Sequence, residues 1–220
     1  MKTSLAYLNI VMPYDPRREK VWKEITSYLK KYISKNDIVL ELGAGYCHFI
    51  NNVKAKDKYA LDLDKEVLKQ YAATGVHTIS GDVLNIKKLI NRKFDIIFAS
   101  NLLEHISINE LHSLFPIIKE MLTDKGRFII LQPNYRYSFK EYFDDFDHIT
   151  VFDHISLQRL LLIHGFKITK VFKKFLPYSM DSKLPTLKWL VYLYLRIPIK
   201  LFAKQMLIIA TNDTENYGSR

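Results

Sequence analysis

The sequence predicts an α/β fold, in which helices cover both faces of a mostly parallel β-sheet within a single domain. Three observations lead to this prediction. Short apolar runs alternate with helical stretches along most of the chain, as in right-handed βαβ units. These runs are continuously apolar, as expected of parallel strands that are buried on both faces. The length of 220 residues, with 48% hydrophobic and 25% charged residues, fits one globular domain.

The elements can be taken in order along the chain. Residues 17–33 place Val21, Ile25 and Leu29 at helical spacings, with Lys and Glu between them, and predict an amphipathic helix. The alternation then predicts strands at residues 38–40, 59–61, 76–79, 94–99 and 127–131, and helices at residues 49–53, 65–73 and 108–122. Residues 1–12 lack the small-residue cleavage site of a secretory signal, and we read them as mature sequence.

The C-terminal third departs from this alternation. Residues 156–164 are helical, and Gly165 supplies a C-terminal cap. Strands are expected at residues 166–172 and 205–211, separated by about 30 residues rich in Pro, Trp, Tyr and Leu. Segments of this length usually form lids or binding elements. The single domain, 1–220, therefore divides into an N-terminal helical cap (1–36), a core (37–172), a basic and aromatic insertion (173–204) and a last strand (205–211).

The net charge of +10 is clustered rather than diffuse. Residues 165–210 hold nine cations and one acid, which gives 9 − 1 = +8, whereas residues 141–153 hold five acids and no Lys or Arg. A basic cluster favours an anionic partner such as a nucleic acid or a membrane surface. The longest apolar run there, residues 189–195, is too short to span a bilayer. A lone cysteine, Cys47, excludes a disulfide scaffold, so we expect a cytoplasmic protein.

A glycine-containing turn gives the strongest local signal. Val39-Leu40-Glu41-Leu42-Gly43-Ala44-Gly45 is a buried strand that runs into a turn and opens a helix. Glycine lets a ligand approach the backbone and permits a positive φ. A dinucleotide fingerprint would have a third glycine at position 48, where this chain has His48, which argues against an NAD enzyme.

Two carboxylates follow the next two strands. Asp62 ends the second strand, 21 residues after Glu41, where a carboxylate can accept both hydroxyls of a ribose. Asp64 is better explained as the N-cap of the helix that begins at Lys65. Asp82, after the third strand, can accept the exocyclic amine of adenine, although an Asp after Gly81 is also ordinary turn chemistry.

Taken together, these motifs resemble those of the class I S-adenosylmethionine (SAM)-dependent methyltransferases. The match runs from about residue 36 to 172 and comprises Glu41-Leu-Gly-Ala-Gly, Asp62, Gly81-Asp82 and Phe94-Asp-Ile-Ile-Phe-Ala-Ser-Asn-Leu-Leu-Glu-His105. It implies a Rossmann-like three-layer sandwich with a mostly parallel seven-stranded sheet and an antiparallel last strand. It also implies SAM as the cofactor, held by Glu41, Gly43, Ala44, Gly45, Asp62, Leu63, Asp82, Val83, Asn101, Leu102 and His105.

A finer resemblance concerns the acceptor. The stretches Gln132-Pro-Asn-Tyr, Glu141-Tyr-Phe-Asp-Asp-Phe-Asp-His148 and Leu176-Pro-Tyr with Lys204-Gln205 look like a bacterial subgroup associated with surface-polysaccharide biosynthesis. We therefore expect an O-methyltransferase that acts on a small molecule or glycan intermediate. Asn134, Tyr135 and Tyr142 are expected near the acceptor.

Methyl transfer to a hydroxyl requires the protein to align the acceptor and to remove a proton. His105, His148 and His154 are candidate bases, because imidazole titrates near physiological pH and all three follow the fourth or fifth strand at the ligand-binding edge. His105 is better explained as a cofactor-side or packing residue, which leaves His148 and His154 as the preferred candidates. Asp145 and Asp147 could orient the ring of His148. The spacing of this acidic run does not match an oxygen-rich metal loop, so no metal is expected.

Two alternatives stay open. The basic C-terminal segment suits an RNA methyltransferase, although no RNA-binding module is recognised and Asn101 is followed by Leu-Leu rather than by Pro-Pro-Tyr. The chain could instead be a SAM-binding protein without catalysis. The insertion combines Trp189 and Tyr192 with Lys188 and Arg196, a composition that also suits peripheral contact with an anionic membrane. The sequence predicts nothing about oligomeric state.

Overall fold

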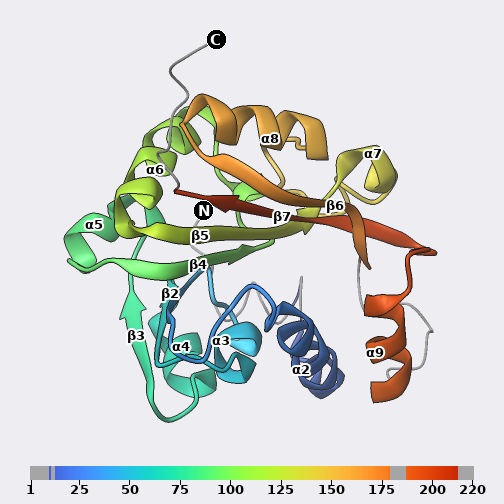
Figure 1. The fold of residues 1–220 in the computed structure, drawn as a ribbon, viewed down its shortest axis with the longest axis horizontal. Helices are drawn as coiled ribbons and strands as arrows, with labels where there is room; N and C mark the ends of the chain where they lie inside the picture. Colours follow the sequence, from blue (N-terminus) through green and yellow to red (C-terminus); the bar gives the residue numbers. More distant parts are fainter. Residues whose placement is uncertain (1–9, 11–12, 179–186, 213–220) are drawn as a thin grey trace.

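A seven-stranded sheet forms the centre of the molecule (Figure 1). The computed structural model describes residue 10 and residues 13–178 and 187–212. The sheet order is β3-β2-β1-β4-β5-β7-β6. The strands are β1 (Ile38–Leu42), β2 (Asp57–Asp62), β3 (Val76–Ser80), β4 (Phe94–Ser100), β5 (Leu122–Pro133), β6 (Lys167–Pro177) and β7 (Ala203–Thr211).

Strand direction confirms the predicted sheet. β3, β2, β1, β4 and β5 pair in parallel, and β7 pairs antiparallel with both β5 and β6. β7 therefore runs against the other six strands. Strand β1 is hydrogen-bonded to β2 on one side and to β4 on the other, so the turn after Leu42 opens at the centre of the C-terminal edge.

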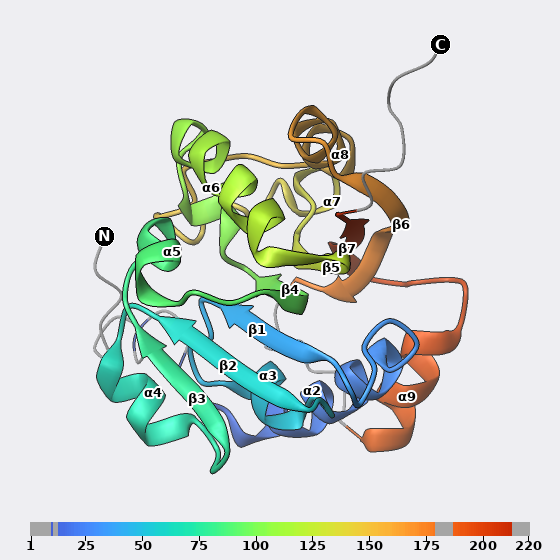
Figure 2. The ribbon, with the colours of Figure 1, turned by 60° about the vertical axis from the view of Figure 1, so that its left-hand side comes forward.

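Helices form two layers on the faces of the sheet (Figures 1 and 2). Helices α5, α6 and α8 cover one face, and α2, α3, α4 and α9 cover the other. The helices are α2 (Pro16–Leu29), α3 (His48–Asn52), α4 (Lys65–Tyr71), α5 (Ile86–Leu89), α6 (Ile108–Met121), α7 (Tyr135–Ser138), α8 (His154–Ile163) and α9 (Lys188–Arg196). Each face has its own buried apolar cluster; Phe115 and Phe128 lie in one, and Phe49 and Phe98 stack 3.7 Å apart in the other.

Several boundaries differ from the predicted ones for local reasons. Helix α8 begins at His154 rather than at 156, because the Asp153 side chain accepts hydrogen bonds from the backbone of Ile155 and Ser156. Strand β6 extends to Pro177, because its pairing with β7 resumes after an irregularity between Phe172 and Leu176. The predicted insertion therefore shortens to the segment between β6 and β7. Residues 179–186 of that insertion and residues 1–9 and 11–12 of the N-terminal cap lie outside the described residues.

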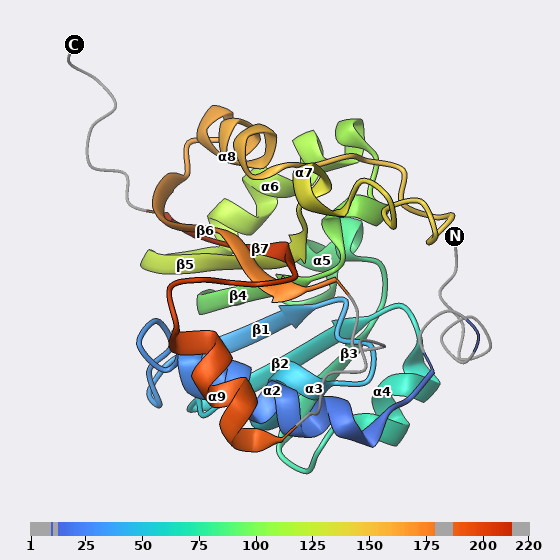
Figure 3. The ribbon, with the colours of Figure 1, turned by 90° about the vertical axis from the view of Figure 1, so that its right-hand side faces the viewer.

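The remainder of the insertion packs against the N-terminal helix. Helix α9 lies alongside α2 on the same face of the sheet (Figure 3). Leu195 is buried in the cluster beneath them. None of the described helices is long and apolar enough to cross a membrane.

The sheet edge accounts for part of the basic cluster. Strand β6 lies at one edge of the sheet and exposes four lysines, Lys167, Lys170, Lys173 and Lys174. Lysines on an edge strand oppose pairing with the strands of other molecules. These four cations therefore have a structural explanation that requires no anionic partner.

Candidate functional site

A cavity of about 1170 Å³ opens at the C-terminal edge of the sheet. The ends of β1, β2 and β4 and the segment that follows β5 contribute lining residues. Helices α2 and α9 contribute apolar side chains, among them Trp22, Val191 and Tyr194. Open α/β sheets bind ligands at this edge, so the cavity is the candidate active site.

The turn after β1 has the backbone that its glycines predict. Gly43 and Gly45 have φ of 64° and 47°, and both line the cavity. A Cβ on Gly43 would lie 2.9 Å from a methyl carbon of Leu102, whereas a Cβ on Gly45 would meet nothing within 4 Å. Gly43 thus serves close packing, and Gly45 leaves an open, left-handed backbone at the cavity wall.

Asp62 and Glu41 accept backbone hydrogen bonds that hold this turn and the helix after it in place. Asp62 Oδ2 accepts the backbone N–H of Gly45 at 2.8 Å, and its Oδ1 accepts that of Asp64 at 3.0 Å. Burial raises the pKa of Asp62, and these two N–H groups oppose the rise. Glu41 is fully buried, and its Oε2 accepts the N–H of Ile50 in α3 at 3.0 Å. Burial raises the pKa of Glu41 well above its ordinary value.

All the other residues predicted to hold the cofactor also line the cavity. Ala44, Leu63, Val83 and Leu102 contribute apolar surface. Asp82 caps the short helix η1 (Val83–Asn85) through a 2.9 Å bond from Leu84 N–H to Oδ1. Asn101 follows β4 with a φ of 48°, a left-handed conformation that Asn tolerates better than most residues.

A second group of polar side chains also lines the cavity. Glu104 and His105 follow β4 in the short helix η2 (Leu103–His105), and His148 comes from the segment after β5. The rings of His105 and His148 have centroids 4.8 Å apart. The structure thus places His105 beside His148. The backbone carbonyl of Glu104 accepts the N–H groups of Ile149 and Thr150, which fixes the segment after β5 over η2.

His148 is buried with one nitrogen bonded and the other directed to a carboxylate. Its Nδ1 lies 2.6 Å from the carbonyl oxygen of Tyr142, which can only accept a hydrogen bond, so Nδ1 carries the proton. Nε2 lies 3.7 Å from Asp145 Oδ2. Burial lowers the pKa of His148, and the neighbouring His105 lowers it further. The neutral ring therefore presents an unprotonated Nε2, and Asp145 would stabilise a proton gained there.

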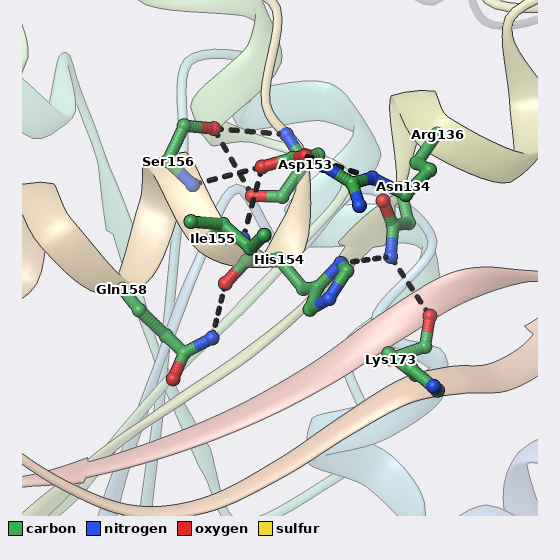
Figure 4. Close-up of polar contacts among 8 residues, drawn as sticks. All are labelled: Asn134, Arg136, Asp153, His154, Ile155, Ser156, Gln158 and Lys173. Carbon is green, nitrogen blue, oxygen red and sulfur yellow. Dashed lines mark hydrogen bonds and ion pairs between the residues drawn. The ribbon is translucent and has the colours of Figure 1, made fainter.

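His154 occupies a different environment, shown in Figure 4. Its Nδ1 lies 3.1 Å from the Asn134 amide nitrogen, and its ring stacks on Tyr137. The same amide donates to the carbonyl oxygen of Lys173 at 2.8 Å. His154 is not among the described residues that line the cavity. Of the candidate bases, the structure brings His105 and His148 to the cavity, but not His154.

The residues predicted to contact the acceptor are also placed apart from the cavity lining. Asn134 is fully buried and bonded as above. Tyr142 is fully buried, and its hydroxyl donates to the carbonyl oxygen of Thr150 at 2.6 Å. The Tyr135 ring packs edge-on against Tyr142. In the structure, these three residues shape the segment that carries His148.

Two groups of side chains lie close enough to share a metal ion, although no metal was expected. They are Glu104, His105 and His148, and His105, Asp145 and Asp147; within each group the ligand atoms lie within 4.8 Å of one another. In the second group His105 Nδ1 already lies 3.2 Å from Asp147 Oδ1.

Sequence reasoning missed several residues that line the cavity. Glu104 was overlooked beside His105, although a carboxylate that interrupts an apolar run after a strand is a usable signal. Arg18 and Trp22 belong to α2, where amphipathic spacing explained them as ordinary helix residues. Only the tertiary structure brings α2 and α9 to the cavity wall, so no local pattern could have found them.

Glycines with positive φ, a carboxylate at the end of β2 and a cavity at the C-terminal edge are the features of an α/β protein that binds a ligand at the ends of its parallel strands. The comparisons with known proteins agree with this geometry and narrow it. Residues 14–171 match a family model described as a methyltransferase domain. An uncharacterized protein of Methanocaldococcus jannaschii is 30% identical over 163 residues, which cover 74% of this chain and 68% of that protein.

Solved structures share the fold. A SAM-dependent methyltransferase from Archaeoglobus fulgidus has a TM-score of 0.64 at 18% identity, covering 86% of this chain and 94% of that one. Magnesium protoporphyrin IX methyltransferase from Synechocystis, solved with bound SAH, has a TM-score of 0.60 at 10% identity, covering 89% and 83%. The chain belongs to the methyltransferase-domain family, with the class I fold. Its cofactor is SAM.

The residues present fit SAM. Asp62 keeps acceptor capacity for ribose hydroxyls, because each carboxylate oxygen has two lone pairs and each already accepts one backbone N–H. The open backbone at Gly45 leaves room beside it. Among the described lining residues the only Lys or Arg is Arg18, which suits a cofactor without phosphate groups.

Proposed function

We propose that this methyltransferase transfers the methyl group of SAM to a hydroxyl of a small molecule or glycan intermediate. When bound, SAM supplies an electrophilic methyl group on its sulfonium. The placement of His148 carries the proposal, because His148 lines the cavity, its Nδ1 is fixed by Tyr142 and its Nε2 lies 3.7 Å from Asp145. A hydroxyl is a poor nucleophile until a base removes its proton, whereas a neutral amine needs no base to attack.

In this proposal each residue has one task. Asp62 binds the ribose, and Asp82 with Val83 binds the adenine. His148 takes the hydroxyl proton at Nε2, and Asp145 stabilises the imidazolium that forms. Apolar side chains such as Trp22, Val191 and Tyr194 exclude water from the acceptor. His154, which is bonded to Asn134 outside the cavity lining, has no task at the reacting atoms.

The experiment is methyl transfer from isotopically labelled SAM to metabolites, followed by identification of the product by NMR. A methyl ether as product supports the proposal. A product with the methyl group on nitrogen, carbon or sulfur contradicts the proposal that the acceptor group is a hydroxyl. An RNA acceptor is disfavoured by the cavity itself, because carboxylates surround His148 and would repel phosphates. Complete absence of transfer, with SAM bound, would favour the alternative of a binding protein without catalysis.

The proposal includes a cytoplasmic location with contact to an anionic membrane surface. Support comes from the exposed side of α9 and the segment after it. Large apolar side chains are exposed there, flanked by cations (Leu187, Trp189, Tyr192, Leu193, Ile199, Leu201 and Phe202, with Lys188 and Arg196). Aromatic anchors combined with cations are the requirements for interfacial binding.

A further inference from the structure

The cavity differs sharply in charge from the whole chain. The chain carries +10, yet the described residues that line the cavity include nine carboxylates and one Lys or Arg. Glu41, Asp62 and Asp82 lie at or just after the ends of β1, β2 and β3, which form the proposed cofactor end, and Arg18 comes from α2. The segments that follow β4 and β5, which we call the acceptor end, supply the other six (Glu104, Glu110, Glu141, Asp144, Asp145 and Asp147) and contribute no Lys or Arg to the described lining residues.

Four of these carboxylates are already engaged. Asp147 lies 3.2 Å from His105, and Asp145 lies 3.7 Å from His148. Glu141 forms an ion pair with Lys204. Glu110 belongs to the capping box at the start of α6. Their presence at the cavity therefore has a structural explanation.

Glu104 is different. Its side chain has no exposed surface in the structure, it lines the cavity, and neither Oε1 nor Oε2 has a hydrogen-bond partner among the described residues. A buried carboxylate without a partner is costly, and it persists where a ligand supplies the partner. Burial raises the pKa of Glu104 to about 8, and the charges of Asp145 and Asp147 contribute to the rise. A cation placed beside it would reverse this effect.

We propose that the methyl acceptor carries a positively charged amino group and that Glu104 binds this group. The inference rests on the proposed function and names its substrate class: an amino alcohol or amino sugar. An ammonium group offers three donors, which suit the two unpartnered oxygens of Glu104. Ligand atoms of Glu104 and His148 lie within 4.8 Å of each other. An amine and a hydroxyl on neighbouring carbon atoms can therefore contact Glu104 and His148 together.

The charge of the acceptor can be tested before its identity is known. An extract of the source cells is separated at pH 7 on a cation-exchange resin, and each fraction is incubated with the protein and methyl-labelled SAM. We expect label only in compounds from the retained fraction. Label confined to the neutral or anionic fractions would overturn the inference and leave the proposed function standing. Absence of label in all fractions would overturn the proposed function instead.

A parallel arm tests a metal ion as the cation at Glu104. The incubation is repeated with a chelator and with added Mg²⁺. Methyl transfer that needs Mg²⁺ and goes to a neutral acceptor would overturn the assignment of an ammonium group at Glu104, because the metal would then supply the positive charge. Transfer to the retained fraction that is unaffected by the chelator supports it.

Glu104→Gln provides the matched variant, because it keeps the size and shape of the side chain, removes its charge and replaces one acceptor oxygen with a donor NH2 group. We expect at least a 10-fold rise in KM for the retained acceptor, with SAH affinity unchanged by calorimetry as proof of folding. Glu120→Gln is the control, since Glu120 pairs with Lys87 on the surface. An unchanged KM in folded Glu104→Gln would refute the assignment of Glu104.

Discussion

Asp62 at the end of β2 accepts a 2.8 Å hydrogen bond from the backbone N–H of Gly45 in the turn after β1. One carboxylate thus fixes the position of the turn and keeps lone pairs for a ligand. The sequence separates the two residues by 17 positions, and parallel pairing of β1 with β2 brings them together. Loss of this side chain should affect cofactor binding first.

We expect Asp62→Ala to weaken binding of SAM and SAH by about 1.5 to 3 kcal/mol, the range for a hydrogen bond to a charged group. Calorimetry measures it directly. Asp64→Ala is the matched control, because Asp64 caps α4 and its loss should cost about 1 kcal/mol of stability without changing SAM affinity. NAD should not compete. Unchanged affinity in Asp62→Ala would remove the ribose assignment.

For His148→Ala we expect turnover to fall by about 10²- to 10⁴-fold, the usual contribution of a general base, with SAM affinity nearly intact. His154→Ala serves as the comparison, because His154 bonds Asn134 away from the cavity lining. Single-turnover methyl transfer distinguishes the two. A loss in His154→Ala with a near-normal His148→Ala would exchange their roles.

The pH dependence of turnover follows from the same residue. A base must be unprotonated to act, so activity should rise with pH as His148 loses its proton. Because burial lowers the pKa of His148, the midpoint of this rise in activity should lie below the ordinary pKa of histidine. A rising limb centred above an ordinary histidine pKa would assign the proton to another group.

Glu104 should make stability depend on pH. Burial raises its pKa from 4.5 to about 8, so between these values the folded protein holds a proton that the unfolded chain has lost. Stability therefore falls as pH rises through this window, by up to about 1.4 kcal/mol per pH unit. Urea unfolding at pH 5 and pH 8 should show a smaller decrease in Glu104→Gln. Equal decreases in both proteins would mean that Glu104 titrates normally.

The membrane proposal can be tested with vesicles. We expect the protein to sediment with anionic but not neutral vesicles, with binding that weakens as salt is added, since each basic residue contributes about 1 kcal/mol near an anionic surface. A variant with Lys188 and Arg196 changed to Gln should bind less. Replacing Lys167 and Lys170 on β6 is the control for net charge. Equal losses in both variants, or no binding at all, would confine α9 to packing beside α2.

Local sequence information sufficed for the sheet, for one helix cap and for the strand-end residues at the cavity. Alternating apolar runs predicted the sheet, because parallel strands buried on both faces must be apolar wherever they lie in the chain. The N-cap role of Asp64 was confirmed for a similar reason, since a cap requires only the residues that follow it. Placement of Glu41, Gly43 and Asp62 at one cavity follows from their positions at neighbouring strand ends.

The acceptor end depended on contacts between residues distant in sequence. His148 and His154 are six positions apart and chemically alike, and only the packing of the segment after β5 over η2 separates them. The same packing buries Glu104 away from water, so its raised pKa is a property of the folded chain alone. The sequence determined the family and the cofactor side because their residues follow strand order. Tertiary structure decided that His148 rather than His154 lines the cavity and that Glu104 is buried there without a hydrogen-bond partner among the described residues, because burial and partners arise only when distant segments meet.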